Sequence, residues 1–275
     1  AIDLTPLRTV DAALDIAVEG VAARGVDLGP TKARLALDNG LLDLAVADTA
    51  LQDGTVGGRL ALDGRRPIPA AALDLRLNGV QAGPLLARFA RFEALQGLAS
   101  GTMALRAEGS TRQAMLGSLD GEGAVQIRNG SFRGLDLVRA VQSAAAMLRG
   151  GAAEAGGELT EFAELSATWR IVDGILRTDD LALKAPLLVG QGKGSVDLPA
   201  ATVDMRIEAR TSGLDLTVPL QLRGPLAKPT VDPDLAGLAG QALGGRKPEE
   251  ALKGLLDGLS SGAKPADVLR GILGR

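Results

Sequence analysis

Two carboxylate pairs and one glycine-rich segment have a spacing that suggests chemistry. Asp179-Asp180, and Asp232 with Asp234, offer the oxygen ligands that Ca²⁺ prefers, and residues 190–195 (GQGKGS) are similar to a phosphate-binding loop. Neither pair lies in an Asp-x-Asp-x-Asp-Gly loop. The glycine segment lacks the G-x-x-x-x-G-K-(S/T) spacing and precedes a predicted strand rather than a helix. We therefore predict no metal site and no cofactor, and we assign these residues to solvated turns or caps.

Covalent catalysis lacks most of its usual side chains. The sequence contains no His, no Cys and no Tyr. A Ser or Thr nucleophile would then need Lys or a carboxylate as its base. We expect that the protein is not an enzyme.

The composition describes an aliphatic chain with a nearly balanced charge. Hydrophobic residues make up 46% of the sequence but aromatic residues only 2%, and the formal net charge is −3. The small number of aromatic rings argues against a pocket that stacks planar ligands, and the absence of a Lys/Arg stripe argues against nucleic acid as a partner.

The absence of cysteines is compatible with both the cytoplasm and the periplasm. No apolar run is long enough to span a bilayer as a helix. The sequence starts inside a strand-like alternation without an initiator Met, so we expect a trimmed fragment.

Alternating aliphatic and polar residues predict many short strands. Residues 33–37 and 42–46 have period two and flank Asn39-Gly40. Such dipeptides tolerate the positive φ angles of tight hairpin turns. Similar pairs recur at Asp53-Gly54, Asp63-Gly64, Asn78-Gly79, Asp120-Gly121, Asn129-Gly130 and Asp173-Gly174. The pattern predicts 15 to 18 strands, a sheet too wide to stay flat, which must therefore curl, split or close.

Helical spacing appears at three places. Residues 84–98 and 135–149 each carry apolar residues on one face, and the Gly/Pro-rich tail after residue 233 contains three short amphipathic segments. We expect the helix at 84–98 to pack on the sheet as a lid or plug. The predicted organisation is a β-meander over 1–80, a β region with two inserted helices over 81–232, and a helical tail over 233–275.

Three segments resemble the AsmA family of bacterial envelope proteins. They are residues 121–137 (GEGAVQIRNGSFRGLDL), residues 162–198, which contain WRIVDGILRTDDL and end in VGQGKGSVDL, and residues 218–234 (VPLQLRGPLAKPTVDPD). Together they are similar to the periplasmic C-terminal region of that family. Residues 1–80 fit the looser strand repeats that precede this region.

The resemblance implies a fold and a function. The expected fold is mainly β, an elongated, curled, antiparallel-rich sheet that forms a hydrophobic groove with a few short amphipathic helices. The expected function is non-enzymatic phospholipid binding or transport that supports outer-membrane biogenesis. The protein would lie in the periplasm and be held at the inner membrane by an N-terminal anchor. Its expected partners are phospholipid acyl chains and, as a further class, outer-membrane proteins.

Fourteen residues of the aliphatic alternations are the groove candidates. From the residues alone, an ordinary closed core stays open as an alternative, in which case the protein would be a scaffold for outer-membrane protein assembly. The candidates are Leu35, Leu37, Leu42, Leu44, Leu60, Leu62, Leu105, Val125, Ile127, Leu181, Leu183, Val203, Met205 and Ile207.

Overall fold

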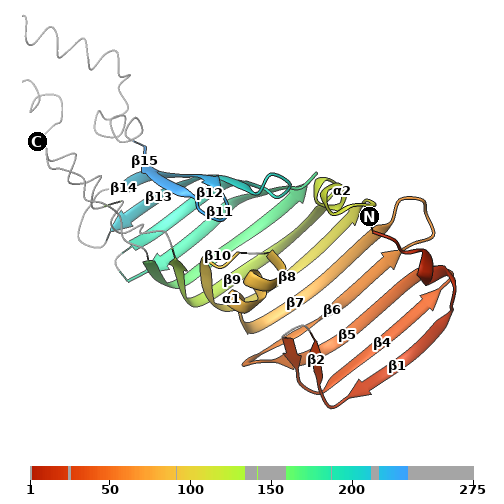
Figure 1. The fold of residues 1–275 in the computed structure, drawn as a ribbon. Helices are drawn as coiled ribbons and strands as arrows, with labels where there is room; N and C mark the ends of the chain where they lie inside the picture. Colours follow the sequence, from red (N-terminus) through yellow and green to blue (C-terminus); the bar gives the residue numbers. More distant parts are fainter. Residues whose placement is uncertain are drawn as a thin grey trace, which may run out of the picture.

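The chain forms one open antiparallel sheet of fifteen strands (Figure 1). The computed structural model describes residues 2–23, 26–90, 92–133, 141, 159–186, 188–211 and 217–234. The strands are β1 (Ala12–Val18), β2 (Val21–Ala23), β3 (Val26–Leu28), β4 (Thr31–Asp38), β5 (Leu41–Leu51), β6 (Gly54–Asp63), β7 (Ala70–Gln81), β8 (Leu95–Glu108), β9 (Asp120–Arg133), β10 (Leu159–Val172), β11 (Ile175–Ala185), β12 (Leu188–Asp197), β13 (Thr202–Thr211), β14 (Thr217–Pro225) and β15 (Thr230–Pro233). The predicted mainly-β fold and the predicted number of strands are confirmed.

The topology is a meander. From β4 onward each strand pairs with the next one along the chain, and β1 pairs with β4. The small β2–β3 hairpin lies off this path and joins the sheet through Leu28, opposite Leu51 of β5. The sheet twists along its length and does not close, so β1 and β15 form its two edges (Figure 1).

The Asn-Gly and Asp-Gly pairs have two structural uses. Asn39-Gly40 and Asp173-Gly174 form two-residue hairpin turns in which both residues have positive φ. Asp53-Gly54 and Asp63-Gly64 stand where β6 begins and ends. The turns predicted at Asn78-Gly79, Asn129-Gly130 and Asp120-Gly121 are wrong, because the first two lie inside β7 and β9 and the third opens β9.

The two internal pairs occupy irregular points of the ladder. The register between β7 and β8 shifts between Leu77 and Val80, and Asn129 has φ of 49°. One type of β-bulge places a residue in the left-handed region, as a tight hairpin turn does, and Gly79 and Asn129 have such positive φ angles, so the dipeptide alone does not distinguish the two.

The predicted helix over residues 84–98 is wrong at both ends. Helix α1 covers Ala82–Leu85 and continues as the π-helical turn η2, Leu86–Ala90, after which Leu95 already starts β8. Gly97, within the predicted helix, lies in that strand with φ of 133°. Pairing of β8 with both β7 and β9 overrides the helical spacing of its first residues.

Two further short helices were not predicted. They are the 3₁₀ turn η1 (Thr5–Arg8) and α2 (Arg112–Gly117), where the Thr111 hydroxyl accepts a hydrogen bond from the Ala114 N–H. The predicted helix at 135–149 lies outside the described residues except for the buried Val141. The tail from residue 235 onward also lies outside them.

The sheet has an aliphatic face and a polar face. Directly opposed residues of antiparallel strands share a face, so the register traces one row of each kind across the sheet. The row on the aliphatic face contains Leu14, Leu35, Leu44, Leu60, Leu73, Leu105, Gly121, Ile171, Leu176, Val196, Val203 and Gly224. The row on the polar face contains Asp15, Arg34, Ala45, Arg59, Asp74, Ala104, Glu122, Arg170, Arg177, Ser195, Asp204, Arg223 and Thr230.

Candidate functional site

All fourteen groove candidates lie on the aliphatic face. Leu35, Leu44, Leu60, Leu105 and Val203 belong to the aliphatic row itself. A second row beside it joins Leu37, Leu42 and Leu62. Further candidates lie two residues apart on the same side of their strands: Val125 and Ile127 on β9, and Met205 and Ile207 on β13. Leu183 of β11 pairs with Leu165, which pairs with Ile127, and Leu181 lies two residues before Leu183 on the same face. The period-two pattern therefore predicts the shared face correctly.

The aliphatic face is half-exposed at one end and buried at the other. From β4 to β8 the candidate leucines are partly accessible, and Leu14 of β1 is 52% exposed. From β9 onward the face becomes core: Ile127, Leu183, Val203, Met205 and Ile207 are each 9% exposed or less. Val125, Trp169 and Leu181 stay partly accessible, so the aliphatic surface that a ligand can reach covers β1 to β8 and continues at these positions of β9 to β11.

Helix α1 and turn η2 mark the boundary between these parts. Leu85 and Leu86 pack with Phe92 against a buried cluster that includes Val80 and Ile127. α1 lies against β8, and Figure 1 shows it at the strand ends near β8 and β9, about midway between β1 and β15. The helical segment covers the sheet as the expected lid or plug would.

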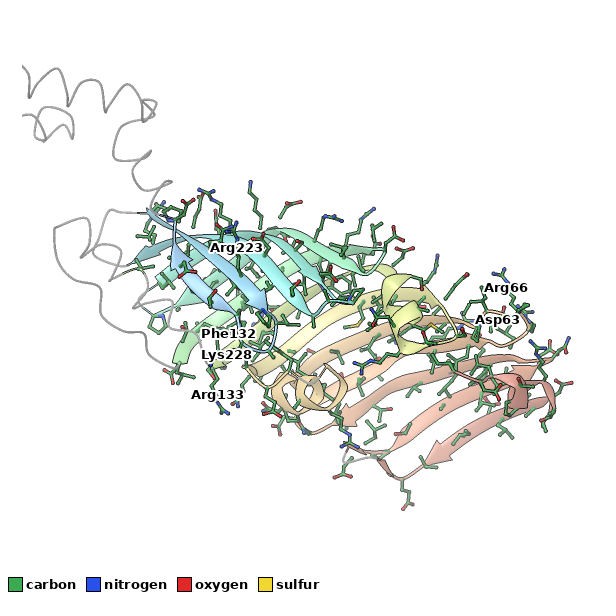
Figure 2. The ribbon with its side chains drawn as sticks, turned by 45° about the horizontal axis from the view of Figure 1, so that its top comes forward. Asp63, Arg66, Phe132, Arg133, Arg223 and Lys228 are labelled. Atoms are coloured by element: carbon green, nitrogen blue, oxygen red, sulfur yellow. The ribbon has the colours of Figure 1, made fainter. Side chains whose placement is uncertain are left out.

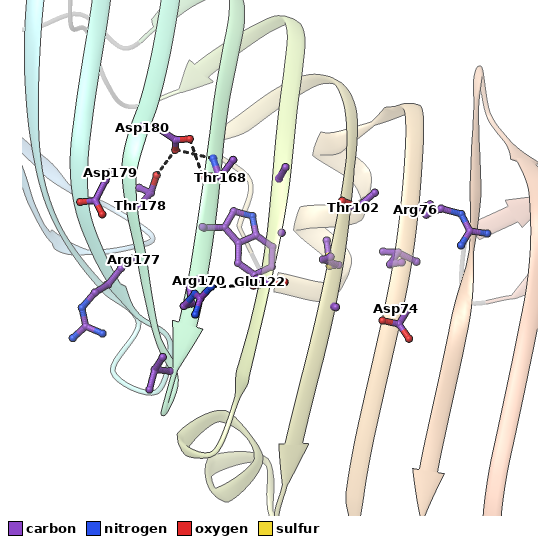
Figure 3. Close-up of a pocket in the computed structure, with 17 residues that line it drawn as sticks. Asp74, Arg76, Thr102, Glu122, Thr168, Arg170, Arg177, Thr178, Asp179 and Asp180 are labelled. Atoms are coloured by element: carbon purple, nitrogen blue, oxygen red, sulfur yellow. Dashed lines mark hydrogen bonds and ion pairs between the residues drawn. The ribbon is translucent and has the colours of Figure 1, made fainter.

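The described cavities lie over the polar face. The largest, of about 980 Å³, runs from β7 to β11 (Figure 3). It is open, and its lining includes Asp74, Arg76, Thr102, Glu122, Thr168 and Arg170. Of the fourteen groove candidates, Leu105 and Leu181 alone border any described cavity. The aliphatic face is therefore a surface and not an enclosed pocket in the part of the chain that the structure describes.

Charged side chains of the polar face neutralise one another across strands. Arg170 is 3.3 Å from Glu122, and Arg34 is 2.9 Å from Asp15. The hydrogen bond from Arg59 lowers the pKa of Asp43, as ion pairing does for a carboxylate. Figure 2 shows charged side chains such as Arg223 along the sheet. These pairs are solvent-exposed and are typical of a solvated sheet face.

Asp180 completes an irregular strand pair instead of a turn. Its carboxylate accepts hydrogen bonds from the N–H and the hydroxyl of Thr168, at 2.8 and 2.7 Å, and from Thr178 (Figure 3). These bonds, first of all the one from the Thr168 hydroxyl, lower the pKa of Asp180. The ladder between β10 and β11 shifts register here. The turn or cap role predicted for Asp179-Asp180 is wrong, since both lie inside β11.

The roles predicted for two other segments are also wrong. Asp232 lies in β15 opposite Gln221 and not in a turn, whereas Asp234 follows the strand and forms an ion pair with Arg206 at 3.0 Å. Residues 190–195 form the interior of strand β12, not a turn. At Gly192, an added Cβ would approach Leu181 Cδ2 to 3.0 Å, so the missing side chain makes room for its neighbours on the aliphatic face.

Trp169 stands on the aliphatic face, inside the sheet and not at its edge. It lies opposite Gly123 on β9, and a Cβ at Gly123 would collide with its indole ring. The ring is partly accessible. Gly123 pairs in turn with Met103, which pairs with Leu75, so the indole adjoins the half-exposed part of this face. The strand register shows the glycine beneath it, which the sequence pattern alone does not indicate.

Other chemistry finds little support among the described residues. They contain no group of three acidic side chains that could hold a metal ion, and no helix among them is long and apolar enough to cross a membrane. One Ser-x-x-Lys spacing, Ser261 to Lys264, does stand in the sequence. It lies outside the described residues. Its lysine is one of the two kinds of base that a Ser nucleophile could use in this chain.

The comparison with protein families matches residues 3–181 to the AsmA family. The match covers 179 of the 275 residues. It includes the N-terminal strands, where the sequence resemblance was weakest, and it ends before residues 218–234. No curated protein and no solved structure matches the chain.

Proposed function

Because the chain belongs to the AsmA family of bacterial envelope proteins, we propose that its aliphatic sheet face binds phospholipid acyl chains in the periplasm. The protein would act without catalysis and would support transport of lipid for outer-membrane biogenesis, with the full-length chain held at the inner membrane.

The observation that carries this proposal is the uninterrupted aliphatic row. It crosses the sheet from Leu14 to Leu105 with a leucine on every strand of the path, and these leucines are half-buried or exposed. Leaving an acyl chain in water costs about 0.8 kcal/mol per CH₂, or about 12 kcal/mol for sixteen carbons. Contact with the leucines offsets much of that cost, and a surface of small aliphatic side chains offers no preferred stopping point.

A scaffolding role in outer-membrane protein assembly is the second candidate. The burial of Ile127, Leu183 and Ile207 favours it, since this part of the face is closed core. The two functions differ at the half-exposed leucines, which a scaffold has no need to keep accessible.

The test uses the single tryptophan of the chain as a probe. Phospholipid with brominated acyl chains quenches tryptophan only at contact. We expect strong quenching of Trp169, and weak quenching when the probe is moved to the polar face by Trp169→Phe with Val172→Trp. Val172 is 47% exposed and follows Arg170 on that face. Equal quenching at both positions would contradict the proposal.

A pair of charge substitutions gives an independent measurement. Leu44→Asp places a carboxylate in the aliphatic row, while Ala45→Asp places one on the opposite face of the same strand. We expect phospholipid that co-purifies without detergent, measured by native mass spectrometry and extraction, to fall several-fold in Leu44→Asp only. Lipid-free, monomeric, stable wild-type protein would instead support the scaffold.

A further inference from the structure

Charged residues that stand directly opposite one another on the polar face are nearly always of opposite sign. Like charges in such positions are destabilising, so complementary pairing is expected of a stable sheet. No two acidic residues of the described strands are directly opposed. The complementary pairs are Asp15/Arg34, Arg59/Asp74, Arg106/Asp120, Glu122/Arg170, Arg128/Glu164, Glu164/Lys184 and Asp204/Arg223.

Two neighbouring pairs break this pattern, and both are basic. Arg170 of β10 stands opposite Arg177 of β11, and Lys193 of β12 stands opposite Arg206 of β13. Arg170 and Arg206 each have an acidic partner elsewhere. Arg177 and Lys193 form no ion pair with any residue that the structure describes. The polar face therefore carries two cations without a counter-charge on adjacent strands.

These two cations lie close enough to bind one group together. Arg177 stands opposite Ser195, and Lys193 precedes Ser195 by two positions on the same face of β12. Diagonal neighbours of this kind are about 7–8 Å apart, within reach of long side chains. Figure 3 shows Arg170 turned toward Glu122, while Arg177 extends to the other side. A guanidinium, an ammonium and a hydroxyl group can thus donate to one ligand.

The cations open into two described cavities that share Asp179. Arg177 and Asp179 line the cavity of about 980 Å³, and Asp179 and Lys193 line a second one of about 360 Å³. Asp179 lies at the register shift of β11, where it comes next to Lys193. It forms no ion pair with a described residue either. One carboxylate facing two cations reduces the positive charge of the site without removing it.

We propose that Arg177, Lys193 and Ser195 bind the phosphate group of a ligand. A phosphate has enough oxygens to accept from all three donors, and its charge matches two cations. A carboxylate has two oxygens and a single charge, so it would leave one donor unused. The site lies on the face opposite to the aliphatic row. This inference therefore does not depend on acyl-chain binding.

Titration with inorganic phosphate tests the proposal. The backbone amide resonances of isotope-labelled protein are followed by NMR at constant ionic strength. We expect saturable shifts at Arg177, Lys193 and Ser195. Arg177→Gln with Lys193→Gln should weaken binding about tenfold or more, because charge-assisted hydrogen bonds are lost. A wild-type protein without saturable shifts at these residues would overturn the proposal. Acetate that binds as tightly as phosphate would contradict the choice of ligand.

Lys32→Gln with Arg106→Gln is the matched control. Lys32 and Arg106 are exposed on the polar face of β4 and β8, and their replacement changes the net charge by the same amount. This control should keep the wild-type affinity for phosphate. An equal loss in the two double variants would overturn the proposal, because general attraction to positive charge would then explain the binding.

Thermal unfolding separates a ligand-binding role of Arg177 from a structural one. In phosphate-free buffer, Arg177→Gln should not lower the Tm, since it removes the repulsion from Arg170. Added phosphate should raise the Tm of the wild type and not that of Arg177→Gln. A lower Tm of Arg177→Gln without phosphate would identify a structural role and contradict the proposal. Asp179→Asn should bind phosphate more tightly, and weaker binding would contradict the site.

Vesicle sedimentation distinguishes the two sources of the phosphate. Vesicles of phosphatidylcholine with and without phosphatidylglycerol are compared, so that any acyl-chain binding contributes to both. Extra retention by phosphatidylglycerol that Arg177→Gln with Lys193→Gln abolishes would identify a lipid headgroup. Equal retention by both vesicles, together with binding of inorganic phosphate, would identify a soluble phosphate compound. Extra retention that the double variant keeps would contradict the role of these two residues.

Discussion

Large side chains of this sheet lie over glycines on neighbouring strands. Trp169 lies over Gly123, Phe162 over Gly130, and the carboxylate of Asp48 over Gly57. In each pair, a Cβ on the glycine would collide with the large group. The glycines of these strands therefore make room across the ladder, a role distinct from turn formation.

Gly123→Val tests this arrangement at Trp169. The added side chain must push the indole off the strand, and we expect a loss of about 1–3 kcal/mol in the free energy of unfolding, as overpacking typically causes. The displaced ring should become more exposed, so the emission of the single tryptophan should shift to longer wavelength. Gly117→Val is the control, because a Cβ at Gly117 meets nothing within 4 Å. Unchanged emission in Gly123→Val would contradict the packing.

Asp180→Asn tests the hydrogen bonds at the β10–β11 irregularity. The pKa of Asp180 is lowered in the fold from its ordinary value of 3.8, mainly by Thr168. A lowered pKa means that the ionised carboxylate stabilises the fold above about pH 4, and that this contribution is lost as the pH falls through the folded-state pKa. We expect Asp180→Asn to have a lower Tm than wild type at pH 7, with a difference that shrinks below about pH 4. Asp179→Asn is the neighbouring control, and a difference independent of pH would contradict this account.

At the scale of elements, local pattern and pairing compete. Period-two alternation predicts the strands well because each of them has one aliphatic and one polar face. The helical spacing of residues 84–98 fails from Leu95 onward, since that residue belongs to a strand paired on both sides. Asn78-Gly79 and Asn129-Gly130 carry the signal of a turn but serve as bulges. In these two pairs the sequence predicts residues that can adopt positive φ, and strand pairing determines whether they form a hairpin turn or a bulge.

The segment formed by α1 and η2 carries a prediction of its own. Leu86 and Phe92 cover the aliphatic face beside Val80 and Ile127. Leu86→Ala with Phe92→Ala should expose this surface while the sheet persists. We expect bis-ANS fluorescence to rise and the far-UV circular dichroism to stay unchanged. The cost in unfolding free energy should be below that of two fully buried large-to-small changes, about 2–5 kcal/mol each.

Arg88→Ala is the control for this segment, because Arg88 is exposed on the same turn. If the double variant binds no more dye than Arg88→Ala, the segment is not the cover of the aliphatic face.

At the scale of the whole molecule, the polar face adds solubility more than stability. Several of its ion pairs are highly exposed: the side chains of Arg34 and Asp15 are 77% and 79% accessible, and those of Arg170 and Glu122 are 73% and 69% accessible, while the acidic partner is more covered in others, such as Asp43 at 27%. Exposed pairs of this kind contribute little, because water and salt screen them. Burial of the aliphatic face from β9 to β14 is the stronger contribution.

Salt dependence follows from this division. Raising NaCl from 50 to 500 mM should change the Tm by less than about 2 °C, and the amount of co-purified phospholipid should also stay constant, since acyl contacts are apolar. Differential scanning calorimetry and lipid extraction measure the two quantities. A large fall in either with salt would show that the polar face contributes more than the exposure of its ion pairs suggests.

The sequence by itself determined the strand-rich fold, the family and, within each strand, which residues lie on the aliphatic side, because alternation with period two is a local property of the chain. The tertiary structure decided which part of that face is open, since the burial of Ile127 and Ile207 depends on what packs over them. It also decided that Asp180 and residues 190–195 lie within strands. These properties arise from pairing between residues distant in the chain, which local alternation does not encode.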